Sequence, residues 1–147
     1  MNAIGTYAYQ IELAEPMPEA REQVIAALAQ QGFGVLTEID VQATLHDKLG
    51  VESVPYRILG VCNPTLAHQA LTASPHVGLM LPCTVALREE NGRTIVEVLR
   101  PEAALSVVGI DELRPTAAEA ERRLLLVAEA LDQTALNVTG AAVAPGS

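Results

Sequence analysis

One stretch decides how the chain folds: residues 56–64, with the sequence YRILGVCNP. In an extended chain, alternate side chains point to opposite faces, and in residues 56–62 both faces are mainly apolar. Such a strand is typical of the centre of a sheet, where it is buried on both sides. Gly60 is its one residue without a side chain, which predicts that another backbone or a ligand approaches closely there.

The end of this stretch predicts a helix. Asn63 is a favoured N-cap residue, and Pro64 suits the first helical position. We expect the helix to end near Ala73, because Pro75 follows. The central strand therefore passes directly into a helix, with Cys62 at the junction.

Periodic patterns predict the neighbouring elements. Alternation every two residues predicts strands, and apolar residues recurring every three to four positions predict helices. Asp40 is a good N-cap, Gly32 and Gly50 suit helix C-termini, and Asn91-Gly92 is a strong hairpin signal. The expected strands are 6–13, 33–41, 56–62, 77–87 (interrupted by Pro82) and 94–99, and the expected helices are 19–31, 41–49, 64–73 and 115–136.

The last of these helices, Pro115–Leu136, is the longest expected element. Thr116 and Glu119 form a capping-box pattern at its start. Its apolar stripe is wider than one sheet face needs, because Leu125 and Leu126 extend it. We expect residues 1–136 to form a single domain and residues 137–147 a flexible C-terminal tail.

The composition excludes several function classes. With 9 Lys and Arg against 18 Asp and Glu, the net charge is −9, so neither nucleic acid nor an anionic membrane is an expected partner. Charged residues make up only 18% of the chain, which favours burial of surface in a homodimer. No signal segment or membrane span is evident, and two cysteines make no secreted disulfide scaffold, so we expect a cytoplasmic protein. The pattern as a whole predicts an α+β fold: a single two-layer domain with a mixed sheet of about five strands backed by helices.

The two cysteines, Cys62 and Cys83, are the candidate functional groups. Unpaired N–H groups at the start of the helix after Asn63 would favour a thiolate or an anion beside Cys62. The alternative is a small buried apolar residue, since free cysteine is among the most buried residue types. We expect a ligand site formed by Gly60, Cys62, Asn63 and Cys83.

Whether the two thiols meet depends on Pro82. A strand–helix–strand unit predicts that the strands carrying Cys62 and Cys83 are parallel. If the second strand starts near Val77, Cys83 comes level with Cys62. If it starts at Pro82, the cysteines lie about 20 Å apart, too far for a disulfide.

Three blocks of sequence carry a family resemblance: 33–40, 56–64 and 79–85. In these blocks the chain resembles the bacterial and archaeal family catalogued as domain of unknown function family 302, and the general layout agrees over roughly residues 5–135. The resemblance implies a compact α+β domain that tends to form homodimers. It implies no established activity and so identifies no catalytic residue or cofactor. His68 and His76 lie outside the resemblance, which disfavours a Cys/His metal site.

Two function classes remain open. The first is a binding module whose site around Cys62 takes a small molecule or a thiophilic metal. The second is a thiol-dependent redox enzyme in which Cys62 attacks and Cys83 resolves. The sequence favours the first, because it places no general base near either thiol.

Overall fold

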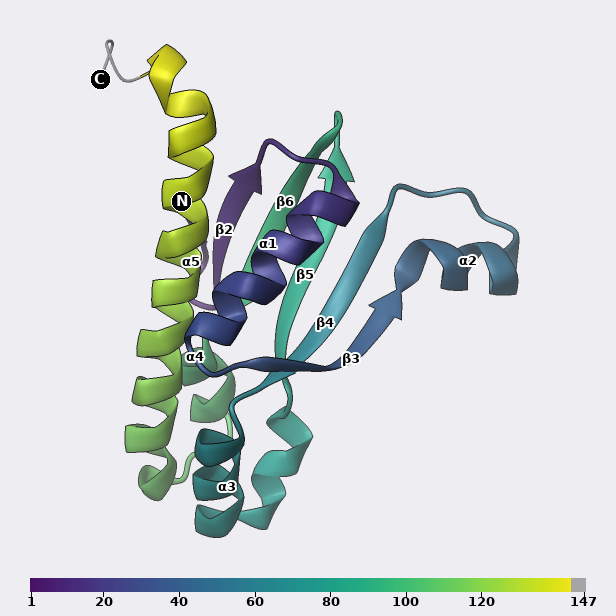
Figure 1. Cartoon of the computed structure of the whole chain (residues 1–147). Coiled ribbons are helices and arrows are strands. Elements are labelled where there is room, and N and C mark those ends of the chain that lie inside the picture. Colours follow the sequence, from purple (N-terminus) through teal and green to yellow (C-terminus); the bar gives the residue numbers. More distant parts are fainter. Residues whose placement is uncertain (144–147) are drawn as a thin grey trace.

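The computed structural model describes the backbone of residues 1–143 and the side chains of residues 1–135. Within these residues one sheet contains six strands in the order β1-β2-β6-β5-β4-β3, and every neighbouring pair is antiparallel (Figure 1). The strands are β1 Asn2–Ile4, β2 Ala8–Leu13, β3 Gly34–Asp40, β4 Tyr56–Cys62, β5 Cys83–Glu90 and β6 Arg93–Leu99. The α-helices are α1 Met17–Gln30, α2 Val41–Leu49, α3 Pro64–Ala73, α4 Pro101–Ser106 and α5 Arg114–Val143, and the 3₁₀ helices are η1 Pro75–Met80 and η2 Asp111–Leu113.

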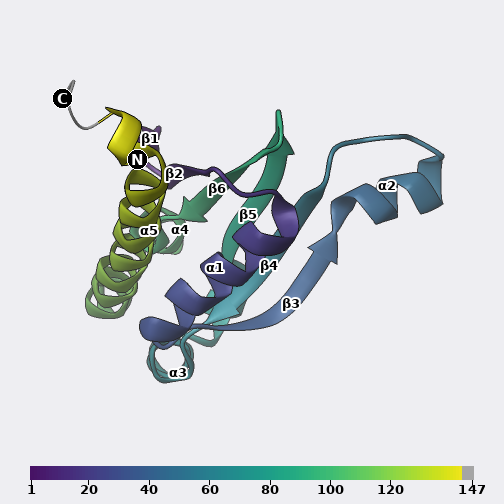
Figure 2. The ribbon, with the colours of Figure 1, turned by 45° about the horizontal axis from the view of Figure 1, so that its top comes forward.

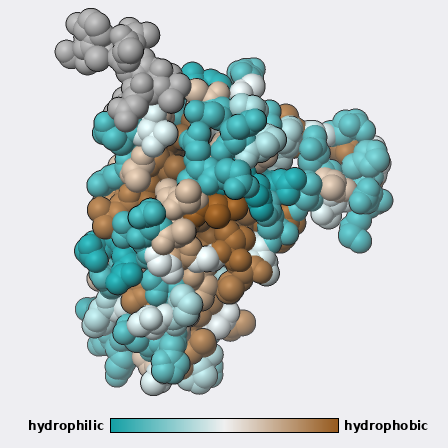
Figure 3. Space-filling model, in the orientation of Figure 1, coloured by the Kyte–Doolittle hydropathy of each residue, from teal (hydrophilic) through white to brown (hydrophobic). Residues whose placement is uncertain are grey.

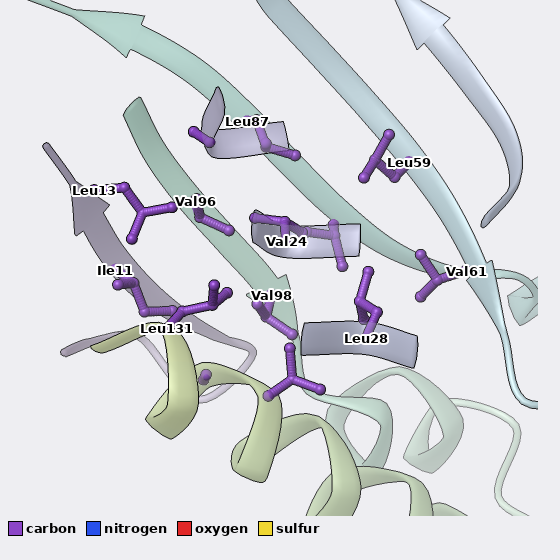
Figure 4. Packing of buried hydrophobic residues seen from close by; sticks show 14 of the residues in the cluster. Ile11, Leu13, Val24, Leu28, Leu59, Val61, Leu87, Val96, Val98 and Leu131 are labelled. Carbon is purple, nitrogen blue, oxygen red and sulfur yellow. The ribbon is translucent and has the colours of Figure 1, made fainter. Parts of the chain in front are cut away.

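The core lies between the sheet and two helices, α1 and α5, which pack against the same sheet face (Figures 1 and 2). Apolar residues of the four middle strands meet Val24 and Leu28 of α1 and Leu131 of α5 (Figure 4). The predicted stripe of α5 forms this contact, since Leu124, Val127, Ala128 and Leu131 are all buried. The α+β class, the helices backing one sheet and the long C-terminal helix are therefore confirmed.

Local sequence signals predicted several boundaries correctly. The Asp40 carboxylate accepts a hydrogen bond from the Ala43 N–H at 2.9 Å and so caps α2, which ends at Gly50 with φ of 65°. Asn91 and Gly92 both have positive φ and form the tight turn between β5 and β6. In each case the residue's own chemistry satisfies the local backbone, independently of the rest of the fold.

The prediction of a mixed sheet with parallel strands is wrong. β4 and β5 pair antiparallel, because residues 74–82 turn the chain back toward the end of β4 instead of returning it to the start. The sheet also has a sixth strand, β1, that the sequence pattern did not indicate; it pairs with β2 through a tight connection that includes Gly5, with φ of 52°.

Two expected boundaries also differ. The strand expected at 77–87 begins only at Cys83, because residues 75–80 form η1 and its Val77 side chain is fully buried. The helix expected to end at Leu136 continues through Val143, within the stretch expected as a flexible tail. The chain has no proline there before Pro145, so nothing removes a backbone donor from the helix. The rest of that expected tail, residues 144–147, lies outside the described residues.

Parts of the surface are apolar. Ile39 is 49% exposed on the sheet face away from α1, where Ile58 and Ala86 lie beside it across β4 and β5. Figure 3 shows further hydrophobic residues on the other side of the molecule, between α1, α5 and the start of β3. No helix in the described part of the chain is both long and apolar enough to cross a membrane.

Candidate functional site

The two cysteines come together where β4 ends and β5 begins. Val61 pairs directly with Cys83, so Cys62 follows the residue that faces Cys83 across the two strands. The strand that carries Cys83 starts directly after Pro82. For this start, and with β4 and β5 parallel, the two cysteines were expected to lie about 20 Å apart. Antiparallel pairing reverses that outcome, because the start of β5 then lies beside the end of β4. Both cysteines are free and half-buried.

A cavity of about 280 Å³ opens at this end of the sheet, and we call it the inner cavity. Its walls come from the β4–α3 junction, from the segment between η1 and β5, and from α4 and α5. Cys62, Asn63 and Cys83 line it, so three of the four predicted site residues come together. The other lining residues are almost all apolar and include Phe33, Leu36, Leu66, Ala67, Ala70, Leu81, Leu99, Leu105 and Ala120.

The fourth predicted residue, Gly60, lies elsewhere. It lines a more open hollow of about 410 Å³, which we call the outer groove, together with Thr37, Ile58, Leu79 and Thr84. A Cβ atom on Gly60 would collide with the Thr37 hydroxyl oxygen and would lie 2.7 Å from Pro82 Cγ. The close approach expected at Gly60 therefore exists, but it comes from two side chains of the chain itself.

Asn63 has a structural role at the edge of the inner cavity. Its side chain is buried; its Oδ1 accepts a hydrogen bond from the Leu66 N–H at 3.2 Å, and its Nδ2 donates to the Gln31 carbonyl at 3.4 Å. The amide also packs against Gly32, where a Cβ would lie 2.9 Å from Nδ2. Both polar atoms of the side chain are thus engaged, and the residue joins the start of α3 to the end of α1.

Burial controls the chemistry of Cys83. Removal of its thiol from water, with a smaller contribution from neighbouring Cys62, raises the pKa of Cys83 to about 11. At neutral pH this thiol is therefore protonated, and it packs against the apolar core. A protonated thiol is neither a nucleophile nor a metal ligand.

The described side chains do not assemble a metal site. Nowhere among them do three or more His, Cys, Asp or Glu residues gather closely enough to hold an ion. His68 and His76 are exposed on α3 and η1, and neither lines the inner cavity. The fold therefore does not bring Cys62, His68, His76 and Cys83 together as one set of ligands.

Most of the cavity wall could not have been identified from the sequence. The helical spacing predicts that α3 buries Leu66, Ala67, Ala70 and Leu71; Leu66 and Ala70 are buried, whereas Ala67 is half-buried and Leu71 is 43% exposed. Leu99, Leu105 and Ala120 come from three later elements that only the tertiary fold brings to the cysteines. One signal was available: Pro101 begins α4, as a proline at the first helical position does.

Fold and site together define a small α+β domain with an apolar cavity at one end of an antiparallel sheet. The family model for "Domain of unknown function DUF302" matches residues 9–131, and the chain belongs to that family. It is also similar to a crystal structure of an uncharacterized conserved DUF302 protein from Bacillus stearothermophilus. The identity is 32%, the TM-score is 0.78, and the match covers 85% of this chain and 98% of the other. No curated protein matches the chain. The family resemblance is thereby confirmed.

Proposed function

We propose that the protein is a binding module that takes a small apolar molecule into the inner cavity. The observation that carries this proposal is the lining of the cavity, which is apolar apart from Asn63, Thr116 and the two thiols. Its volume of about 280 Å³ is nearly twice that of an engineered apolar cavity of about 150 Å³ that binds benzene. Small-molecule sites of about 300–1,000 Å³ are common, so the space suits a compact ligand.

The chemistry of the thiols favours binding of an apolar molecule over a thiol-dependent redox reaction and over binding of a thiophilic metal. A resolving cysteine must form a thiolate, and the raised pKa of Cys83 opposes this near neutral pH. A thiophilic metal would need the same deprotonation, and no His, Asp or Glu among the described residues lines the inner cavity to complete a ligand set with the two thiols and the Met80 thioether. A protonated, buried thiol behaves as a small apolar group, which suits an apolar ligand.

The test is binding of N-phenyl-1-naphthylamine, an uncharged probe whose fluorescence rises in apolar surroundings. The protein has no Trp, so its own emission interferes little. We expect saturable binding by the parent and weak binding by Ala67→Leu, because Ala67 lines the cavity and is half-buried. Ala73→Leu is the matched control, since Ala73 lies on the exposed side of the same helix and does not line the cavity. Equal binding by both variants, each with a normal thermal transition, would place the probe elsewhere and refute the proposal.

We propose further that the module is a cytoplasmic homodimer. In support, Leu36 is 65% and Leu79 88% exposed, and the sheet face around Ile39 is apolar and partly open. Contiguous exposed apolar surface of this kind is typical of interfaces. Sedimentation at micromolar concentration should give twice the mass of one chain. A single-chain mass under those conditions would refute the dimer without affecting the proposed ligand site.

A further inference from the structure

The inner cavity and the outer groove share a wall. Met80, Leu81, Pro82, Leu99 and Ala104 line both hollows. Leu81 is half-buried and packs against the cluster that contains Ala70 and Leu105, which themselves line the inner cavity. Its backbone is held by a hydrogen bond from the Leu81 N–H to the Gly78 carbonyl. Leu81 is therefore one of five residues that separate the two spaces, and its side chain packs against residues that line the inner cavity.

Neither hollow offers a partner for a charged group. Among the described residues, no Asp, Glu, Lys, Arg or His lines the inner cavity or the outer groove. The chain as a whole carries a net charge of −9, so its field repels anions. Burying an unpaired ion costs far more than burying a neutral polar group. The ligand that fits is uncharged.

Polar groups are nevertheless available at specific points. Thr116 lines the inner cavity, and Thr37 and Thr84 line the outer groove. A threonine hydroxyl both donates and accepts a hydrogen bond, so it can pair with an alcohol. Both polar atoms of the Asn63 amide already form hydrogen bonds within the protein, so this side chain does not need a ligand as a partner.

We infer that the inner cavity takes an uncharged aliphatic chain with a hydroxyl head and that Leu81 sets the longest chain accepted. This inference rests on the proposed function and names its ligand class. A volume of about 280 Å³ equals roughly nine groups of the size of a water molecule, and a methylene is of similar size. Leu81 belongs to the wall that the two hollows share, so its truncation widens the passage between them, and a flexible chain can extend through that passage into the outer groove.

The test is a series of straight-chain primary alcohols from six to twelve carbons, each competing with N-phenyl-1-naphthylamine. For the parent, affinity should rise about fourfold with each methylene and stop rising near eight to ten carbons. In Leu81→Ala the rise should continue to twelve carbons, with smaller steps because the groove is open. Val107→Ala is the control: Val107 is 73% exposed and lines neither hollow, so the parent pattern should persist.

A second series separates charge from length. Straight-chain carboxylates of the same lengths at pH 8 should bind at least tenfold more weakly than the alcohols. Equal affinity for both would overturn the uncharged class, and an unchanged length limit in Leu81→Ala would overturn the role of Leu81. If Leu81→Ala does not fold, Leu81→Val replaces it, and a limit longer by one or two carbons is expected; no change there overturns the assignment. Absence of probe binding to the parent would instead refute the proposed function itself.

Discussion

Replacement of Asn63 by Ala tests the junction that holds the site together. The substitution removes the cap on the Leu66 N–H and the hydrogen bond from Nδ2 to the Gln31 carbonyl. Loss of an N-cap costs about 1 kcal/mol, and loss of a long neutral hydrogen bond costs roughly 0.5–1 kcal/mol. The Gln31 carbonyl keeps a partner in the variant, because the Arg123 guanidinium also donates to it at 3.4 Å. We therefore expect a loss of about 1.5–2 kcal/mol in the free energy of unfolding.

Urea unfolding measures this loss directly. With a slope of about 2 kcal/mol/M, the midpoint should fall by roughly 0.7–1 M. Asn63→Ser should recover about half of the loss, because a serine hydroxyl can cap α3 but is too short to reach Gln31. Asp40→Ala removes the equivalent cap from α2 together with a partly exposed ion pair to Arg57 at 3.3 Å. Because such a pair contributes little and no described side chain of α2 is buried, this variant should change the midpoint less. If Asn63→Ala matched the parent, or lost no more than Asp40→Ala, the assigned role of Asn63 would be wrong.

Three further predictions follow from the same region and from the α1–β3 contact. Gly60→Val should lower stability by about 1–3 kcal/mol through overpacking, whereas Gly34→Ala, which meets nothing within 4 Å, should be nearly neutral in thermal unfolding; a fully tolerated Gly60→Val would contradict the observed close contacts. Native Cys83 should be alkylated more slowly than Cys62, because with a pKa of about 11 its thiolate fraction at pH 8 is on the order of 10⁻³; rapid modification of Cys62 at low pH followed by a disulfide would instead favour the redox hypothesis. Hydrogen bonds from Arg21 and then Arg57 lower the pKa of Glu38, so its ionised form stabilises the fold above the ordinary carboxyl pKa of about 4.3. The difference in free energy of unfolding between the parent and Glu38→Gln should therefore shrink as the pH falls below that value. A difference independent of pH would show that the ion pair contributes nothing to stability.

The elements that sequence patterns predicted well are those with local causes. β4 was expected at 56–62 and α3 at 64–73, and both have these bounds in the structure. Asn63 and Pro64 act on the first turn of one helix. Such signals depend on a few neighbouring residues, so they can be interpreted without knowing the rest of the fold. The two apolar faces of β4 predicted a central strand buried on both sides, but β4 lies next to the edge strand β3, and Ile58 on its outer face is only half-buried.

Strand direction and the cavity wall have non-local causes and were not accessible in this way. The direction of β5 depends on how residues 74–82 turn. The sequence pattern predicted a strand from residue 77, whereas residues 75–80 form a 3₁₀ helix in which Val77 is buried. Cys62 and Cys83 were recognised as candidates from their positions alone. Burial raises the pKa of Cys83. The cavity that this residue lines also contains Leu99, Leu105 and Ala120 from later elements, and their proximity follows only from packing.

The exposed position of α2 has a practical consequence for altering this protein. The helix interrupts a pair of neighbouring antiparallel strands, in which Asp40 pairs with Arg57, and none of its described side chains is buried (Figure 1). Two strands so placed need only a short turn between them. We therefore expect the excursion from 41 to 54 to tolerate shortening, lengthening or exchange for a reporter sequence without change to the inner cavity. Pro55 must be kept, because its carbonyl accepts a hydrogen bond from the Glu89 N–H of β5 at 3.0 Å.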